Sequence, residues 1–323
     1  MEKTVKLNAI EVCAGAGGQA IGLEAAGFDP VALIDNDENT SITLKANRPA
    51  WPVQNQDLNT FEGRHYRGVD LLAGGLPCPP FSVAGLQKGK EDERDLFPAM
   101  LRLVAEIKPK AVMIENVPGL MAVRFNDYRT QILDQLRNFG YSGEWKLLNA
   151  CDFGVSQYRP RAILVALPDE LTNSFVWPKP NRRPPMPVGD KLYDLMGSRG
   201  WPGTDAWREK ACSIAPTIVG GSLKHGGPDL GPTRAKKAWA ALGVDGHGIA
   251  DQPPGPDFVG IPRLTVRMVA RLQGFPDNWE ILGGKTAAYR QVGNAFPPPV
   301  AKAVASKIKR CLILHQIALG LDQ

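Results

Sequence analysis

The stretch LNAIEVCAGAGGQAIGLEAA, residues 7–26, decides the fold class of this chain. Leu7 to Val12 is predicted to form a strand, and Gln19 to Ala26 is compatible with a helix. Between them lies the glycine-rich loop Cys13 to Gly18. Glycines at a strand-to-helix turn let the backbone pass close to a bound nucleotide, while the helix N-terminus presents free N–H groups. This order indicates the first unit of an α/β fold.

The same alternation continues along the chain before Trp177. A helix is predicted over Leu96–Ile107 because its apolar residues recur at helical spacing. Further strands are predicted at Val31–Ile34, Asp70–Ala73, Lys110–Ile114 and Ala162–Leu167. Short apolar strands that alternate with helices predict a doubly wound, mostly parallel α/β sheet.

The composition changes at Trp177. From there to Pro262 the chain holds 13 of its 28 prolines, 14 of its 34 glycines and 4 of its 7 tryptophans. Such a segment is not regular α/β structure, and its tryptophans argue against disorder. We predict a small, irregular, loop-rich module, with a long structureless insertion as the alternative. Helical patterning returns at Thr265–Gln273 and within Pro297–Leu319. The predicted division is a domain of residues 1–176, completed by 286–323, and a second domain of residues 177–285.

Bulk properties exclude several classes of protein. The net charge of +5 fits a polyanionic partner, although many metabolic enzymes are equally basic. The five cysteines are scattered and do not cluster with the four histidines, so neither a metal site nor a disulfide framework is expected. No signal peptide or membrane-spanning run is recognised. We therefore expect a soluble, cytoplasmic, monomeric protein.

Acidic residues that follow the glycine loop favour a nucleotide site. Asp35 ends the second predicted strand, where a carboxylate accepts hydrogen bonds from ribose hydroxyls. Asp57 is placed to bind the exocyclic amino group of a purine, whereas Asp37 is assigned as a loop residue or helix cap. Together they predict an adenosine-containing cofactor across the strand ends. The loop lacks the full G-x-G-x-x-G dinucleotide pattern, and taken alone it fits a tight turn equally well.

Cys78 is the candidate nucleophile. It lies in Gly74–Ser82, just past a predicted strand, between Pro77 and Pro79, which stiffen the backbone and fix where the sulfur points. The alternative, a buried structural cysteine, does not need such a frame.

Glu115 follows the next apolar strand in the same way and is expected at the same edge of the sheet as Cys78. A sulfur nucleophile beside a carboxyl group suits attack on an electron-poor ring, because the acid neutralises charge that builds on a ring nitrogen. Arg159 and Arg161 alternate along a strand-like segment, so both can reach one pocket. Viewed alone, each of these motifs also fits a cap, an ion pair or a solvated edge.

These residues resemble the motifs of the bacterial cytosine-C5 DNA methyltransferase family along nearly the whole chain. Six stretches match in the family's order: the cofactor loop Ala14–Gly18, the catalytic Pro77–Cys78, Glu115–Val117, the Q-x-R-x-R motif Gln157–Arg161, Arg263–Pro276 and Gln291–Ala295.

The resemblance implies a class I methyltransferase fold, S-adenosylmethionine as methyl donor and a target cytosine flipped out of duplex DNA. Cys78 would attack C6, Glu115 would hydrogen-bond N3, and Arg161 with Arg159 would contact the base carbonyl. The implied cofactor-binding residues are Ala14, Gly15, Gly17, Gly18, Asp35, Asn36, Asp57, Leu58, Pro77, Asn294 and Ala295. Cys13, Asp35, Asn36 and Pro79 depart from the residues usual in the family. The first three are expected to weaken cofactor affinity, and none removes a catalytic group.

The loop-rich module occupies the place of the family's target-recognition domain, and Ser82 to Leu96 resembles the loop that closes over flipped DNA. The predicted DNA contacts are Ser82, Arg182, Arg183, Thr217, Arg234, Lys236 and Lys237. For each of them a solvated surface role is the alternative.

Rival functions remain. A transfer-RNA cytosine methyltransferase has the same motifs, but it tends to carry a smaller insert and a Cys-Phe-Thr tripeptide that is absent here. A non-catalytic DNA-binding relative would lack the Pro-Cys or Glu-Asn-Val residues, and an oxidoreductase would leave Cys78 unexplained. The favoured prediction is a DNA cytosine-5 methyltransferase of a restriction-modification system, with a separate cognate endonuclease as a candidate partner whose existence the sequence does not establish. The sequence does not specify the DNA site.

Overall fold

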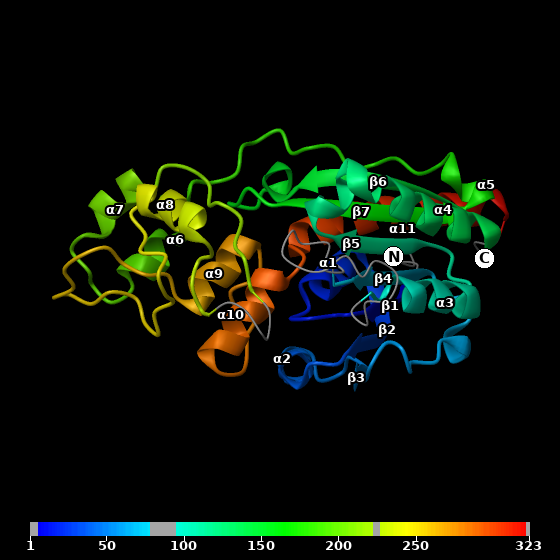
Figure 1. The fold of residues 1–323 in the computed structure, drawn as a ribbon, viewed down its shortest axis with the longest axis horizontal. Coiled ribbons are helices and arrows are strands. Elements are labelled where there is room, and N and C mark those ends of the chain that lie inside the picture. The colour runs from blue at the N-terminus through cyan, green and yellow to red at the C-terminus, as the bar shows by residue number, and fades with distance from the viewer. Residues whose placement is uncertain (1–5, 78–94, 222–226, 321–323) are drawn as a thin grey trace.

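The fold is built on one mixed sheet. The computed structural model describes residues 6–77, 95–221 and 227–320. Within them lies a seven-stranded sheet of order β3-β2-β1-β4-β5-β7-β6 (Figure 1). Its strands are β1 (Leu7–Val12), β2 (Phe28–Asp35), β3 (Val53–Asn55), β4 (Leu71–Gly75), β5 (Val112–Asn116), β6 (Tyr141–Asn149) and β7 (Pro160–Pro168). The first five pair in parallel, whereas β7 is antiparallel to both β5 and β6. The predicted doubly wound, mostly parallel sheet is confirmed.

Helices cover both faces of the sheet. Because side chains alternate along a strand, β1 sends Leu7 and Ala9 into one buried cluster and Ile10 and Val12 into another. The first cluster is closed by α1 (Gly18–Ala26) and α11 (Pro298–Ala318), with the short α5 (Asp169–Thr172) beside them. The second is closed by α3 (Phe97–Ile107) and α4 (Asn126–Asn138). No helix in the described residues is long and apolar enough to cross a membrane.

A third buried cluster lies beyond the sheet. Here α6 (Val188–Gly197), α7 (Thr204–Lys210) and α8 (Thr233–Ala241) stand to one side of the sheet, with α9 (Val266–Gln273) and α10 (Lys285–Asn294) between (Figure 1). Trp207 and Trp239 of the loop-rich module are buried in it together with Ala16 of the glycine loop and Trp51. The tryptophans thus give this proline-rich and glycine-rich region a packed core, which it shares with the N-terminal half of the chain.

Several elements differ from the prediction. The sequence analysis assigned no helix or strand between Ile114 and Ala162, but this stretch contains α4 and β6, and the loop-rich module contains three short helices. Helices α2 (Glu38–Asn47) and α10 and strand β3 were not anticipated either. In α4 only Ile132 and Leu136 are buried, so its apolar pattern is weak. Asp37 is the N-cap of α2 and accepts a hydrogen bond from the Asn39 amide, which confirms its assignment as a helix cap.

Glycine at position 22 sets the distance between α1 and α11. A Cβ at Gly22 would lie 2.5 Å from Ala301 Cβ and 2.6 Å from the Pro298 carbonyl oxygen. We expect Gly22→Ala to lower the free energy of unfolding by about 1–3 kcal/mol, because overpacking outweighs the helix propensity of alanine. Urea unfolding measures this. The control is Gly255→Ala, where a Cβ meets nothing within 4 Å. Equal stability of the two variants would contradict this packing account.

Candidate active site

The predicted site residues come from neighbouring strand ends. The carboxyl ends of β2, β1, β4 and β5 meet at one edge of the sheet, because these strands are parallel and adjacent. Strand β7 is antiparallel to β5, so its first residues lie at the same edge, where Ala162 pairs with Asn116. The topology therefore brings together Asp35, the glycine loop, Glu115 and Arg161, as the sequence analysis expected.

The loop that carries Cys78 begins beside Glu115. Cys78 and Ser82 lie outside the described residues, whereas Pro77 is described and exposed. Gly75 pairs with Glu115 across β4 and β5, and a Cβ at Gly75 would be 3.4 Å from Glu115 Oε2. The buried side-chain amide of Asn116 donates to the Leu76 carbonyl oxygen at 3.1 Å. Asn116 thus fixes the direction in which the chain leaves β4.

Glu115 and Arg161 form a buried ion pair. Arg161 Nε lies 2.7 Å from Glu115 Oε1, and the two side chains are only 10% and 9% exposed. Burial raises the pKa of Glu115 above its ordinary value, and the charges of Arg161 and Arg159 partly oppose that rise. A carboxyl group that is easier to protonate than usual is therefore held against a guanidinium at the strand edge.

Arg159 is fully buried and its guanidinium is surrounded by backbone oxygens. Nη1 donates to the Ile218 carbonyl at 2.6 Å, and Nη2 donates to the carbonyls of Gly293 and Ala295 at 2.7 and 3.0 Å. These three oxygens belong to the loop-rich module and to the end of α10. The contacts of Arg159 in this structure are thus with the chain itself, and its predicted contact with a base carbonyl stays a prediction.

The glycine loop is folded around Asp35. Gly15 and Gly17 have φ values of +53° and +84°, a region that favours glycine. The Gly15 amide donates to Asp35 Oδ2 and the Asp37 amide to Asp35 Oδ1, each at 2.8 Å. A Cβ at Gly15 would meet nothing within 4 Å, so this side of the loop is open.

The C-terminal half of the chain contacts the other side of the loop. A Cβ at Gly18 would lie 2.3 Å from the Phe296 carbonyl oxygen and 3.2 Å from Ala295 Cβ. Asn294 is exposed and its side-chain amide donates to the Gly221 carbonyl oxygen at 3.2 Å. The segment that the sequence analysis placed at the cofactor site therefore does return to the glycine loop.

The remaining predicted cofactor residues surround the start of this loop. Burial raises the pKa of the Cys13 thiol, and the nearby carboxylates of Asp35, Glu11 and Asp57 raise it further. Ala14 and Leu58 are buried, whereas Asn36 and Asp57 are exposed. The structure thus gathers three acidic residues near the start of the loop, and burial raises the pKa of one of them, Glu11, well above its ordinary value.

The predicted DNA contacts are more dispersed. Arg182, Arg183, Arg234 and Lys237 are exposed. Lys236 is half-buried in an ion pair with Asp229 at 2.9 Å. Thr217 donates to the carbonyl oxygen of Tyr158, within the Q-x-R-x-R motif, at 2.7 Å. Thr217 is therefore the one predicted DNA contact that the described residues link directly to the strand edge.

Sequence reasoning missed several residues of this region. Glu11 is buried in β1 and its Oε2 has no hydrogen-bond partner within the described residues. An acidic residue inside an apolar strand was a signal for it. Gln157 donates to Gln273 at 2.6 Å, and the indole of Trp279 donates to the Ala16 carbonyl oxygen at 3.0 Å. No local pattern predicts these two contacts, because their partners are more than a hundred residues apart.

Comparison with known proteins agrees with this geometry. Type II methyltransferase M.NgoMIV of Neisseria gonorrhoeae is 51% identical over 313 residues, which cover 95% of this chain and 99% of the relative. Type II methyltransferase M.NaeI of Lentzea aerocolonigenes is 52% identical over 312 residues, 95% of this chain and 75% of the relative. A structure of Spodoptera frugiperda DNMT2 has the same fold, with a TM-score of 0.64 at 18% identity, covering 95% of this chain and 100% of the other.

The mixed sheet with helices on both faces is the class I S-adenosylmethionine-dependent methyltransferase fold. The chain matches the C-5 cytosine-specific DNA methylase family over residues 7–227 and 231–310, and it belongs to that family. It is a DNA cytosine-5 methyltransferase.

The ion pair gives the site a defined pH dependence. Because the pKa of Glu115 is raised above 4.5, the folded protein binds this proton more tightly than the unfolded chain does. The stability that protonated Glu115 contributes is fully present below the ordinary pKa of a glutamate. It is lost as the pH rises through the raised pKa of Glu115 in the folded protein. Arg161→Met removes the positive charge that partly opposes the rise in the pKa of Glu115. We expect the free energy of unfolding near neutral pH to fall by about 2–4 kcal/mol, and to fall with rising pH more steeply than in the wild type.

Urea unfolding between about pH 5 and pH 8 tests this expectation. The double variant Arg161→Met with Glu115→Gln cannot titrate at position 115. Its free energy of unfolding should therefore lack the steeper fall with rising pH that is expected of Arg161→Met alone. If the single variant follows the wild-type pH profile, Glu115 is not coupled to Arg161 as the structure indicates.

Proposed function

We propose that this enzyme methylates C5 of a cytosine flipped out of duplex DNA, with Cys78 as the nucleophile. The observation that carries the proposal is the buried Glu115–Arg161 pair at the strand edge where the Cys78 loop begins. An electron-poor ring needs both a donor at its nitrogen and a cation at its carbonyl before a thiolate adds to it. Glu115 and Arg161 supply these two groups side by side.

The reaction follows from the chemistry of these side chains. The Cys78 thiolate forms a bond to C6, and the C5–C6 electron pair moves to C5. Protonated Glu115 hydrogen-bonds N3 and Arg161 donates to the ring carbonyl, so both offset the negative charge that develops on the base. The electron pair on C5 would form the bond to the methyl group, while the S–CH3 bond of S-adenosylmethionine would break and its sulfur would leave as a neutral thioether. Water would accept the C5 proton, the electron pair of that C–H bond would re-form the C5–C6 double bond, and the bond between sulfur and C6 would break to release the Cys78 thiolate and 5-methylcytosine.

The residues around the glycine loop fit S-adenosylmethionine, which supplies an electrophilic methyl group on a positively charged sulfur when bound. This molecule carries a sulfonium, an ammonium group, ribose hydroxyls and an exocyclic amine, all of which favour carboxylate partners. Asp35, Glu11 and Asp57 supply such partners next to a loop whose Gly15 side is open. Both Asp35 oxygens already accept a backbone N–H, and each retains a second lone pair for a ribose hydroxyl.

The loop-rich module is proposed to bind the DNA target. The exposed Arg182, Arg183, Arg234 and Lys237 suit phosphate contacts, and Thr217 lies beside the strand edge. Residues 177–285 then form the recognition domain, and residues 1–176 with 286–323 form the catalytic domain. The similarity to two proteins named Type II methyltransferases supports a role in a restriction-modification system, with a cognate endonuclease as a separate chain. We propose that the enzyme acts as a cytoplasmic monomer.

Replacing the nucleophile tests the mechanism. We expect Cys78→Ala to reduce methyl transfer to duplex DNA below about 0.1% of the wild-type rate, because no other group in the proposal adds to C6. Transfer of radiolabelled methyl groups to duplex DNA and to transfer RNA measures the rate and the substrate class. Bisulfite sequencing of DNA from cells that express the wild type identifies the target sequence. Activity that survives Cys78→Ala would exclude the mechanism, and methylation of transfer RNA alone would exclude the DNA substrate.

Replacing Asp35 tests the cofactor site. Asp35→Asn keeps the size of the side chain but removes its charge, so we expect the Kd for S-adenosylmethionine to rise about tenfold. Isothermal titration calorimetry measures this without turnover. The matched control is Asp29→Asn near the opposite end of β2, where the exposed side chain pairs with Lys6. Equal Kd values for both variants and the wild type would place the cofactor elsewhere.

A further inference from the structure

Trp279 contacts the glycine loop from the far end of the chain. It lies in the segment between α9 and α10 and is only 3% exposed. Its indole Nε1 donates to the Ala16 carbonyl oxygen at 3.0 Å. A Cβ at Gly17 would lie 2.9 Å from the indole ring, so the ring also fills the space next to that glycine. Trp279 therefore touches the loop by a hydrogen bond and by packing.

This hydrogen bond fixes one peptide group. The Ala16 carbonyl oxygen and the Gly17 amide belong to the same planar peptide unit. The Gly17 amide donates to the Ala14 carbonyl oxygen at 3.0 Å, while Trp279 holds the oxygen on the other side of that unit. With both polar atoms bound, the peptide plane cannot rotate without breaking a hydrogen bond. Such a rotation changes ψ of Ala16 and φ of Gly17, and the glycine at position 17 makes it otherwise easy.

The indole itself is held in place by its neighbours. Its ring centroid is 5.8 Å from that of Trp51, and the Arg48 guanidinium carbon lies 5.3 Å from it. Arg48 is in turn paired with Glu24 of α1. The ring thus has partners at the end of α2 and in the segment that follows it, which Arg48 ties to α1, and its buried position follows from them.

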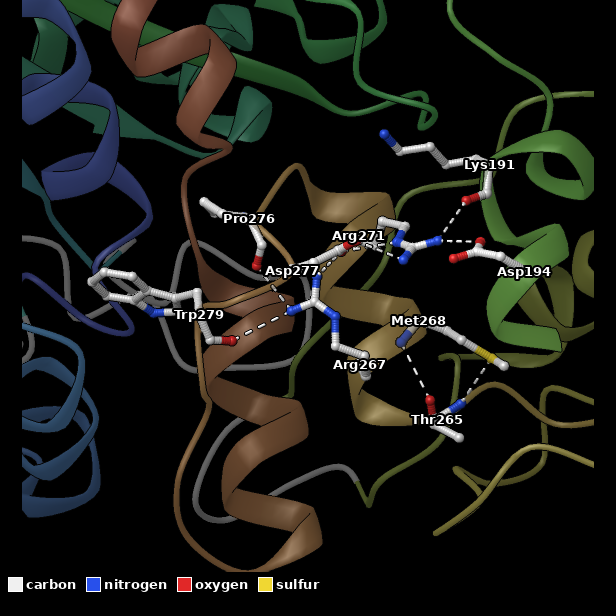
Figure 2. A network of polar contacts seen from close by, with 9 residues as sticks. All are labelled: Lys191, Asp194, Thr265, Arg267, Met268, Arg271, Pro276, Asp277 and Trp279. Carbon is white, nitrogen blue, oxygen red and sulfur yellow. Dashed lines mark hydrogen bonds and ion pairs between the residues drawn. The ribbon is translucent and has the colours of Figure 1, made fainter. Parts of the chain in front are cut away.

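Side chains of α9 hold the backbone around Trp279 by hydrogen bonds and ion pairs. Figure 2 shows Arg267 donating to the carbonyl oxygens of Pro276 and Trp279, at 3.0 and 3.3 Å, while Arg267 and Arg271 both bind Asp277. Arg271 also pairs with Asp194 of α6, in the proposed recognition domain. The segment that carries the indole is therefore tied to the helices of that domain.

The backbone is clamped on the side of α2 as well. The side-chain amide of Asn47 donates to the Glu280 carbonyl oxygen at 2.7 Å and accepts from the Glu280 amide at 2.8 Å. The Leu282 amide donates to Thr43 Oγ1 at 3.1 Å. Residues on both sides of Trp279 thus have fixed positions, so the direction of its N–H is set by the fold.

We propose that Trp279 is a positioning residue for cofactor binding, which holds the Ala16–Gly17 peptide of the glycine loop in its binding conformation. The proposal rests on the proposed role of this loop in binding S-adenosylmethionine. Trp279 acts through Ala16 and Gly17, and its indole N–H contributes cofactor affinity rather than chemistry. The hydrogen bond spans 263 positions of the sequence, so the loop is complete only when the segment after α9 has docked.

Trp279→Phe keeps an aromatic ring and removes the N–H. We expect the Kd and the KM for S-adenosylmethionine to rise about three- to tenfold, as for the loss of one hydrogen bond to a buried partner. The kcat and the KM for DNA should stay within about twofold of the wild type, a split that a general loss of structure would not produce. Calorimetric titration gives the Kd in the absence of DNA, and steady-state kinetics give the other constants.

Trp51→Phe is the matched control, because phenylalanine keeps an aromatic ring against Trp279 in the same buried cluster, and Trp51 makes no hydrogen bond to the glycine loop within the described residues. It should leave the Kd for S-adenosylmethionine within about twofold of the wild type. An equal rise in both variants would indicate general packing and overturn the proposal. An unchanged Kd in Trp279→Phe would also overturn it.

Comparing Asp35→Asn with Trp279→Phe separates a failure of the Trp279 proposal from a failure of the proposed cofactor site. If Asp35→Asn weakens binding and Trp279→Phe does not, the cofactor site stands and the role of Trp279 falls. If neither variant weakens binding, the glycine loop is not the cofactor site. Should Trp279→Phe not unfold cooperatively in urea, benzothienylalanine at position 279 keeps the two-ring shape without the N–H, and the same rise in Kd is expected.

Discussion

A buried guanidinium has to be surrounded by hydrogen-bond acceptors, and the backbone acceptors of Arg159 come from two segments that are far apart in the chain, the loop-rich module and the end of α10. Its nitrogen atoms bind the carbonyl oxygens of Ile218, Gly293 and Ala295. Because an unpaired buried charge costs several kcal/mol, roughly the stability of the whole domain, these segments must close on the sheet together. Gln157 and Gln273 complete the junction, with Gln273 also binding the Ala295 carbonyl oxygen. The sheet, the loop-rich module and the C-terminal return thus depend on one polar contact region.

The geometry of the strand edge follows from that junction. Two residues after Arg159, Arg161 reaches Glu115 at the end of β5. On the other side, Ala295 and Phe296 press against Gly18, where a larger residue has no room. Gly220 approaches Gly293 so closely that a Cβ on either would overlap the other's backbone or its neighbours. Some glycines of the loop-rich module therefore serve close backbone packing, a role that the prediction of a DNA-reading segment did not include.

Part of the fold could be predicted because its signal is local. The strand at Leu7–Val12, the loop after it and the helix that follows agree with the structure to within one residue, since an apolar strand, glycines and a helix have distinct local patterns. The edge strand β6 and the helix α4 were missed because each buries few side chains. Glu115 was expected at the strand edge from its place after a strand, the family resemblance implied that Arg161 contacts the same base, and the two side chains form an ion pair. The position of Cys78 relative to them remains a prediction, since it lies outside the described residues.

The sequence by itself determined the α/β class, the positions along the chain of the strands that carry the site and the chemical types of the reacting side chains, because each of these depends on residues close together in the chain. The order of the strands in the sheet, with β7 antiparallel to β5, came from the structure. Only the tertiary structure decided that Arg159 binds carbonyl oxygens of its own chain and that Asp35 holds the backbone of the glycine loop. It alone brought the indole of Trp279 to the Ala16 carbonyl. Such contacts join segments that are distant in sequence, and a hydrogen-bond donor finds its acceptor only after the strands, helices and returning C-terminal segment have packed.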